Sequence, residues 1–427
     1  MKRDPVLRCL GFALLMLGGA GARAQQAAPF PPIREIAFEG NETTRPRTLL
    51  REMALRVGDP ADPELVERSR QAIQDLGLFR SVDVGQQPLA DGVRLVFTVR
   101  EKYYLIPAPR VDSNSDGQYA YGVQVQWYNA FGLNHTAKSV LKYRNRQQEG
   151  RGTALNFDAS YLAPFIFDSP YGLDLSVSHS AEPVETPLPY DDIRDGARVV
   201  LSRRIANGHS ASQGWRLGAG LQWQDQRTKG EAAPPPGGEA TAIVLNGGYS
   251  DFHFNLYSEA GQSLSAEVQS ALDTLSDYDY TTVVADYDGS WYLGSTPHQT
   301  VALFAEAGTH HGGADGPTIG PFQLGGSGDL RGYRHNFLDG DTYYYAGVEY
   351  LRPVGWDWLR GVVFFEAGNT SDGDGNLNLV RSYADVGIGL RLRATWFVNF
   401  ELNAGVAVPL VDAGDGMGAR YFATGRR

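Results

Sequence analysis

The chain has 427 residues, a formal net charge of −11 and a composition rich in Gly and Tyr. The acidic balance argues against nucleic-acid binding through a general basic surface, so no nucleic-acid partner is expected. The single cysteine, Cys9, lies in the N-terminal segment discussed next. Disulfides, thiolate metal sites and cysteine nucleophiles are therefore excluded from the mature chain.

Residues 1–24 are predicted to be a secretory signal peptide. The segment starts with basic residues, continues with an apolar stretch from Leu10 to Leu17, and ends with the small residues Ala22 and Ala24. The apolar stretch is too short to span a bilayer, and no later run reaches the ~18 apolar residues of a membrane helix. We therefore expect either a large soluble β protein or a transmembrane β-barrel.

Residues 33–101 are predicted to form a compact βααββ module. The phrase IREIAFEGN is expected to form a strand and TTRPRTLLREMAL a helix, with Thr43 or Thr44 as the N-cap. A second helix is expected to begin at Asp62 and Pro63 and to stop at Gly77. The phrases SVDVGQQPL and GVRLVFTVREK then predict two strands, because apolar residues alternate strictly in the second.

Residues 103–427 contain no convincing helix and are predicted to be all β. Sixteen strand candidates follow one another: 103–111, 119–128, 135–145, 152–164, 173–183, 194–205, 215–228, 241–255, 262–272, 280–294, 299–310, 343–354, 359–370, 380–394, 397–410 and 419–427. An even number of strands is typical of bacterial transmembrane barrels.

The connections and the strand faces favour a barrel over a soluble sandwich. Every second connection is short, as in STPH and GWDW, while many of the others are long and polar, as in TSDGDGNLN. The faces opposite the apolar ones carry Gln, Glu, Asn, Tyr and Gly. A polar face fits a wet lumen, whereas a sandwich needs a continuous apolar core. We therefore predict a transmembrane antiparallel barrel of sixteen strands after an α+β module.

The longest connection, about residues 311–342, holds a specific pattern. Loops of this length are usually functional or disordered, and disorder does not require the phrase LGGSGDLRGY. The candidate site residues of this loop motif are Gly325, Gly326, Leu330, Arg331, Gly332 and Tyr333.

Two following strands offer acidic groups on the predicted lumenal face. In GVVFFEAGNT, the face that carries Glu366 also carries Phe364 and Gly368. In SYADVGIGLRLR, the apolar residues face lipid, which turns Asp385 inward. These residues are the candidate lumenal partners of Arg331, whose guanidinium presents several donors in one plane. The alternatives are a solvated Arg331 and acids that only polarise the lumen.

The quoted phrases resemble a known family. QAIQDLGLFRSVDV, with VFTVREK, resembles a POTRA domain, and LGGSGDLRGY resembles the loop motif of the BamA, TamA and two-partner-secretion superfamily. The resemblance implies that the loop folds back into the lumen and that its arginine contacts inward residues. The family usually has Asp where this chain has Glu366, which leaves the pairing geometry open. An unrelated α+β ligand domain is the alternative for residues 33–101.

The resemblance also implies a function and a location. The chain is expected in the outer membrane with its POTRA domain in the periplasm, inserting β-barrel proteins or translocating a polypeptide. Its partners would be an unfolded outer-membrane or secreted client, outer-membrane lipid, and possible periplasmic accessory proteins or chaperones. Insertion and secretion both stay open. The rival interpretations are a passive porin-like channel and export of a separately encoded partner.

A weak seam between the first and last strands is a further expectation. Pro107 and Pro109 lie two residues apart, so their missing N–H groups fall on one side of the first strand. Gly425 lies in the last strand. The alternative is that the prolines only start the strand.

No catalytic residue, metal site or cofactor is predicted. GGSGD lacks the second glycine of a nucleophile elbow, and SDGDGN lacks the acidic residue that would complete a calcium loop. The protein is therefore not expected to be an enzyme.

Overall fold

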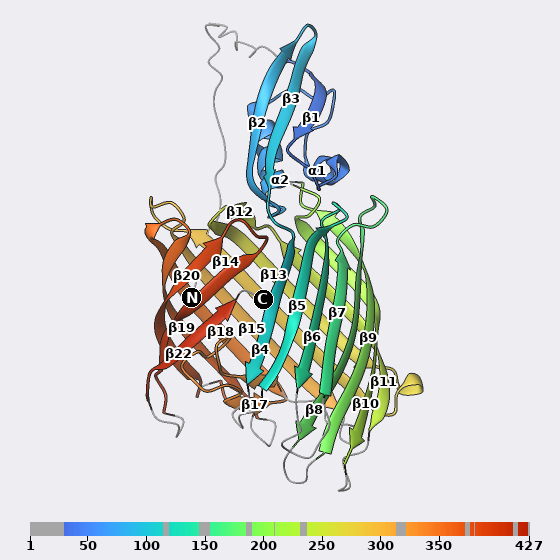
Figure 1. Ribbon diagram of the computed structural model, residues 1–427, viewed down its shortest axis with the longest axis vertical. Coiled ribbons are helices and arrows are strands. Elements are labelled where there is room, and N and C mark those ends of the chain that lie inside the picture. The colour runs from blue at the N-terminus through green and yellow to red at the C-terminus, as the bar shows by residue number, and fades with distance from the viewer. Residues whose placement is uncertain are drawn as a thin grey trace, which may run out of the picture.

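The computed structural model describes residues 30–113, 119–144, 154–184, 190–208, 210–230, 237–312, 322–371, 376–379, 381–412 and 417–425. The predicted signal peptide lies outside these residues. The described chain forms a small N-terminal module (residues 33–101) that stands beyond one end of a large barrel-shaped sheet (Figure 1). Among the helices in the described ranges, none has the length and apolar character needed to cross a membrane.

The N-terminal module has the predicted βααββ order. Its elements are β1 (Ile33–Glu39), α1 (Pro46–Glu52), α2 (Pro63–Gln74), β2 (Phe79–Leu89) and β3 (Gly92–Glu101). The strand order is β1-β3-β2, with β1 parallel and β2 antiparallel to β3. Alternating residues of β3, among them Leu95 and Phe97, are fully buried against apolar residues of α1 and α2 such as Leu49 and Ile73. This core holds the two helices on one face of the sheet.

The predicted N-cap of α1 is wrong, whereas that of α2 is present. The N-cap of α1 is Arg45, which makes no side-chain cap hydrogen bond, and Pro46 opens the helix. The Thr44 hydroxyl donates instead to Glu101 Oε1 at the end of β3. In α2, the Asp62 side chain accepts the backbone N–H of Glu64 at 3.0 Å. Thr44 therefore joins the helix to the sheet rather than capping it.

Seventeen strands form the large sheet within the described residues. They are β4 (Leu105–Ser113), β5 (Tyr119–Ala130), β6 (His135–Arg144), β7 (Ala154–Ala163), β8 (Tyr171–Val184), β9 (Tyr190–Ala206), β10 (Gly214–Lys229), β11 (Gly238–Ser250), β12 (His253–Asn255), β13 (Ser258–Ala271), β14 (Tyr280–Tyr292), β15 (Thr300–Gly312), β18 (Thr342–Trp356), β19 (Leu359–Thr370), β20 (Tyr383–Ala394), β21 (Phe400–Pro409) and β22 (Arg420–Gly425). The additional strand relative to the predicted sixteen is β12, a three-residue strand that pairs with β13.

The strands follow one another around the barrel in chain order, antiparallel throughout. The order returns from β22 to β4, next to which the C-terminal end of the chain lies (Figure 1). A residue-by-residue register joins β21 to β22 and β4 to β5. β22 and β4 are neighbours in the strand order of this sheet.

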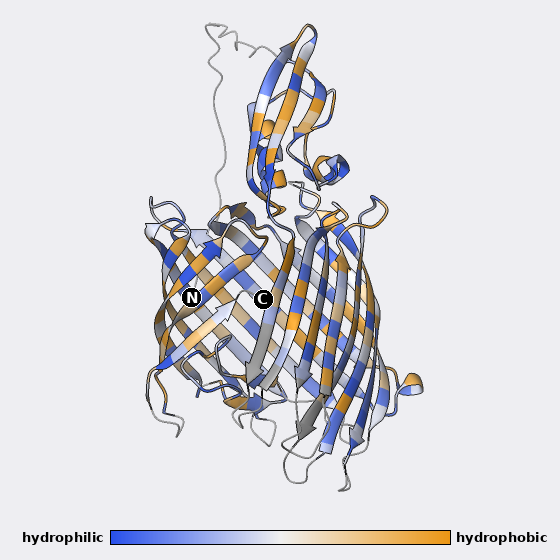
Figure 2. Cartoon of the chain, in the orientation of Figure 1, coloured by the Kyte–Doolittle hydropathy of each residue, from blue (hydrophilic) through white to orange (hydrophobic). Residues whose placement is uncertain are grey.

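The two faces of the barrel differ in polarity, as the alternation predicts. On β20, Val386, Ile388 and Leu390 point outward and are 38%, 64% and 49% exposed. Asp385, on the opposite face of the same strand, is fully buried. On β5, Val123 is exposed. Apolar and polar positions alternate along many strands in Figure 2. An apolar outer surface and a polar interior are the pattern of a barrel surrounded by lipid.

Only three residues, 102–104, separate β3 from β4. The Lys102 ammonium donates to the Gly77 carbonyl at 2.8 Å, and burial lowers the pKa of Lys102 to about 8. Tyr104 is buried, and its hydroxyl reaches the Leu78 carbonyl. The linker is therefore part of the core of the N-terminal module.

Candidate functional site

The segment between β15 and β18 returns into the barrel and packs against its inner wall. Its described part contains β16 (Phe322–Leu324) and β17 (Leu338–Gly340), which pair with each other. Residues 313–321 of the predicted loop lie outside the described residues. Leu324, Leu330 and Tyr333 are buried against lumenal aromatic side chains of β18 such as Tyr343 and Tyr345. We call residues 322–340 the internal loop.

Arg331 is buried, with 6% of its surface exposed, and lies against the inner wall. Its Nη2 atom is 2.6 Å from Glu366 Oε1 and 2.9 Å from Glu349 Oε1. Its backbone N–H donates to Glu366 Oε2 at 3.1 Å. The guanidinium carbon lies 3.5 Å from the ring centroid of Phe364 and 5.1 Å from that of Phe422. A single side chain thus joins the loop to β18, β19 and the last strand, β22.

Asp385 binds the backbone beside Arg331 rather than its guanidinium. Asp385 Oδ2 accepts the N–H of Gly332 at 3.0 Å, and Glu366 lies directly across the β19–β20 ladder. Asp385 Oδ1 and Arg331 Nε have no hydrogen-bond partner among the described residues. The sequence placed both acids in the lumen as partners of Arg331; of these two, Glu366 forms the direct ion pair with its guanidinium.

The other motif residues hold the loop against the strands. Leu330 is fully buried, and the Tyr333 hydroxyl donates to the carbonyl of Ala384 on β20. Gly325 and Gly326 have φ angles of +113° and +129°, which favour glycine. A Cβ on Gly368 would lie 2.7 Å from the carbonyl oxygen of Tyr344, so this glycine allows β18 and β19 to approach closely. The backbone of Gly332 approaches β20 closely, because a Cβ there would lie 2.7 Å from Asp385 Cβ.

Sequence reasoning missed Glu349 as a partner of Arg331. Glu349 is 5% exposed on β18, and its second oxygen pairs with Arg391 Nη2 at 2.7 Å. Its signal was present, because Val348 is exposed and strand alternation then turns Glu349 inward. Phe422 was also missed, and its buried position follows from the same alternation beside exposed Tyr421.

A charged cavity of about 370 Å³ lies in the lumen beside the internal loop. Arg331, Glu349 and Glu366 line it, together with charged residues of β19 to β21. Within the described part of the chain, no group of three or more His, Cys, Asp or Glu is placed to hold a metal ion. The wall of this cavity therefore carries charges of both signs.

Pro107 and Pro109 lie in β4, which neighbours β22 in the strand order. Tyr128 N donates to Tyr104 O at 2.8 Å, and this hydrogen-bonded pair sets the alternation along the β4–β5 ladder. Pro107 and Pro109 are therefore at positions whose nitrogens point away from β5, toward β22. Gly425 pairs with Leu402 of β21. The side of β4 that faces β22 thus lacks two donors.

Two family models match the chain. A model described as "Omp85 superfamily domain" matches residues 129–426. A second model, for POTRA, described as "Surface antigen variable number repeat", matches residues 31–102, which include the N-terminal module.

Known proteins resemble the chain in sequence and in fold. The outer membrane protein assembly factor BamA of Nitratidesulfovibrio vulgaris is 33% identical over 81 residues, which are 19% of this chain and 10% of that protein. BamA from Haemophilus ducreyi lacking POTRA domains 1–3 superposes with a TM-score of 0.57 at 17% identity, over 92% of this chain and 84% of that chain. CdiB from Acinetobacter baumannii superposes with a TM-score of 0.58 at 15% identity, over 92% of this chain and 73% of that chain. At these identities the two structures show a shared fold.

Proposed function

Since the chain belongs to the Omp85 superfamily, we propose that it assembles β-barrel proteins into the outer membrane or moves a polypeptide across it. The chain is an outer-membrane β-barrel protein whose POTRA domain is periplasmic, as in the family. We infer sixteen spanning strands, with the three-residue β12 belonging to the periplasmic turn between β11 and β13.

The observation that carries the proposal is the anchoring of the internal loop to the strands nearest the seam. Arg331 contacts β18, β19 and β22 through buried groups, and Gly332 contacts β20. A passive diffusion channel has no need of an ion-paired loop that reaches its last strand. A protein that opens between its first and last strands needs the strands on one side of the opening held in place.

The seam chemistry supports lateral opening. Because Pro107 and Pro109 offer no N–H toward β22, two hydrogen bonds that would close the sheet cannot form. The terminal strands would therefore separate at a lower cost than if both hydrogen bonds were present. A client strand could pair with either exposed edge.

The POTRA domain supports client binding. Its strand order β1-β3-β2 leaves β2 at an edge, and the residues from Gly85 to Leu89 are exposed there. An edge strand presents unpaired backbone groups to an extended chain. We propose that an unfolded outer-membrane or secreted protein adds to this edge. We expect no catalytic activity, because folding of the client supplies the free energy.

Crosslinking the seam tests this function. Cysteine pairs that join residues 105–109 to residues 421–425 should block client assembly or secretion by purified protein in lipid vesicles, and reduction should restore it. The matched control is a pair at Val283 and Thr309, which are register partners on β14 and β15. Full activity with the seam crosslinked, or equal loss with the control pair, contradicts the proposal. A passive pore would keep conducting ions and would show no client dependence.

A further inference from the structure

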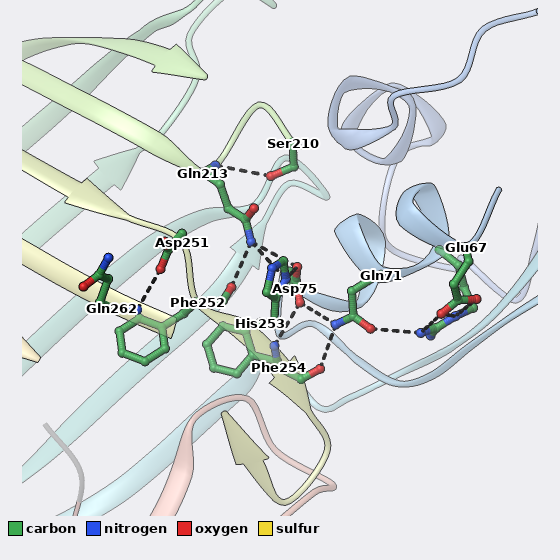
Figure 3. Close-up of polar contacts among 11 residues, drawn as sticks. Glu67, Gln71, Asp75, Ser210, Gln213, Asp251, Phe252, His253, Phe254 and Gln262 are labelled. Atoms are coloured by element: carbon green, nitrogen blue, oxygen red, sulfur yellow. Dashed lines mark hydrogen bonds and ion pairs between the residues drawn. The ribbon is translucent and has the colours of Figure 1, made fainter. Parts of the chain in front are cut away.

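The POTRA domain is tied to a periplasmic turn of the barrel through the Asp75 carboxylate and the Gln71 amide. Asp75, at the end of α2, accepts the backbone N–H of Phe254 at 2.9 Å and the Gln213 side-chain amide at 3.1 Å. His253 Nδ1 lies 2.7 Å from Asp75 Oδ2 (Figure 3). Gln71 of α2 also donates to Asp75. The Gln71 amide also donates to the Phe254 carbonyl at 3.1 Å, so two neighbouring POTRA residues hold strand β12.

Strand β12 carries this contact to the lumen through its ladder with β13. Phe254 is the register partner of Glu259, whose side chain lines the lumenal cavity. Glu259 Oε2 lies 3.3 Å from Arg393 Nη2, and Arg393 Nε lies 3.0 Å from Glu401 Oε2. The contact at the periplasmic turn therefore continues into ion pairs across the barrel interior to β20 and β21.

The same ion pairs continue to the internal loop. Glu401 Oε1 lies 3.3 Å from Arg391 Nε, and Arg391 Nη2 lies 2.7 Å from Glu349 Oε2. Glu349 pairs in turn with Arg331 of the loop. We call this set the charge chain; its members in order are Glu259, Arg393, Glu401, Arg391, Glu349 and Arg331.

The members of the charge chain are buried and alternate in sign. Their side chains are 15% exposed or less, from Arg391 at 15% to Glu401 at 5% and Arg331 at 6%. Removing a neighbour from a buried charge leaves that charge unpaired in a poorly solvated site, which is strongly unfavourable. A displacement of Glu259 therefore leaves Arg393 with one fewer acidic partner and shifts its charge toward Glu401.

We propose that the charge chain couples the docking of the POTRA domain to the position of the internal loop, with Glu259, Glu401 and Glu349 as positioning residues. The proposal deepens the proposed function and rests on it for its purpose, since a client that draws the POTRA domain off β12 would thereby loosen the loop. Coupling of this kind is reciprocal, so a change at the loop also alters the docking of the POTRA domain.

Two spin-label pairs on the full-length protein in lipid nanodiscs measure the two positions separately. Cysteines at Gln87 and Ser295, both exposed, report docking of the POTRA domain. Cysteines at Gly328 and Ser295 report the loop, and a Cβ on Gly328 meets nothing within 4 Å. Distances are measured by double electron–electron resonance. The readout is conformational, so the result does not depend on whether a client is assembled.

Asp75→Ala removes the contacts that the carboxylate makes with Gln71, Gln213, His253 and the Phe254 amide. The variant should therefore raise the fraction of molecules whose POTRA domain is undocked. The displaced-loop population should rise with it by about fivefold or more, the lower end of coupling between distant sites. In the Glu259→Gln background the loop should no longer respond to Asp75→Ala. The matched control is Glu267→Gln, because Glu267 lies on the same strand and pairs with Arg198 outside the charge chain.

An unchanged loop distribution while the POTRA domain undocks overturns the proposal, as does an equal loop response in the Glu259→Gln and Glu267→Gln backgrounds. If Asp75→Ala leaves the domain docked, the double variant with Glu52→Gln also weakens the contact of α1 with Ser212. An unchanged loop in that undocked variant overturns the proposal equally. Loss of client assembly with the coupling intact would count against the proposed function alone.

Discussion

At the scale of single residues, Arg331 combines an ion pair, a backbone contact and two aromatic contacts. Glu366 and Glu349 neutralise its charge, and Phe364 lies against its face. A planar guanidinium satisfies these partners together, whereas the compact ammonium of lysine could not. The function of the loop therefore depends on the shape of this head group as well as on its charge.

Arg331→Ala should destabilise the barrel far more than Arg334→Ala. Removing one partner of a buried ion pair costs about 3–5 kcal/mol, because Glu366 is left buried and unpaired. Arg334, three residues along the same loop, is exposed. The measurement is the temperature at which the folded barrel loses its compact gel mobility. Equal shifts for both variants would contradict a specific internal anchor.

The sequence predicted part of this residue pattern and missed part of it. Glu366 and Asp385 were placed in the lumen by strand alternation alone. The sequence could not predict that Glu366 binds the guanidinium while Asp385 binds the Gly332 amide. Either acidic residue type can accept from either donor. Glu349 was missed because no motif marks β18, although the alternation beside exposed Val348 turns it toward the lumen.

At the scale of secondary structure elements, the internal loop approaches β20 through glycine. A Cβ on Gly332 would lie 2.7 Å from Asp385 Cβ and 2.9 Å from Pro409 N. No neighbouring atom near Gly328 comes within 4 Å of such a Cβ. The two glycines of one loop therefore offer a matched comparison of close approach and open space.

Gly332→Ala should displace the loop and reduce barrel stability, while Gly328→Ala should have little effect. Overpacking of a tight site costs about 1–3 kcal/mol, and a substitution into open space about 0.5 kcal/mol or less. The check is the thermal transition of the barrel together with protease accessibility of residues 322–340. Equal behaviour of the two alanine variants would show that the loop does not pack closely against β20.

The positions of the long strands and their barrel arrangement were predicted from the sequence, whereas the short strand β12 was not predicted as a separate strand. Alternation located the sixteen longer strands, because one face must contact lipid and the other the lumen. The three-residue β12 carries no such alternation, and its place is decided by contact with the POTRA domain. The N-cap of α1 was mispredicted, since Thr44 binds Glu101, which is 57 residues away.

At the scale of the whole molecule, the POTRA domain and the barrel share several buried polar contacts. Thr48 donates to the carbonyl of Gly132 and the Glu52 carboxylate accepts from Ser212, each in a different periplasmic turn. Asp75 adds a third turn. None of these contacts was predictable, because each joins a helix to a turn whose spatial order depends on the closed fold.

Docking of the POTRA domain should strengthen as the pH falls from 7 toward 4. Burial raises the pKa of Asp75 above its usual value of 3.8, so the docked state binds the proton more tightly than the undocked state. The stabilisation of the docked state is fully present below the usual pKa of an Asp carboxyl. It is lost as the pH rises through the raised pKa of docked Asp75. The groups facing Asp75 are Gln71, Gln213, His253 and the Phe254 amide.

The distance between labels at Gln87 and Ser295, followed from pH 7 to pH 4, checks this expectation. In the Asp75→Asn control the carboxyl no longer titrates, and the pH dependence should shrink. A docked share that falls with acid in the unaltered protein would reverse the sign and contradict the burial argument.

The three-residue connection between β3 and β4 couples the POTRA domain mechanically to the first strand of the barrel. Lys102 and Tyr104 are both held by the segment that follows α2, at Gly77 and Leu78, so the connection cannot act as a loose tether. A rotation of the POTRA domain would therefore be transmitted to β4, the strand that carries Pro107 and Pro109 beside β22. A force applied to the POTRA domain would act first on a strand that lacks two hydrogen-bond donors toward its neighbour.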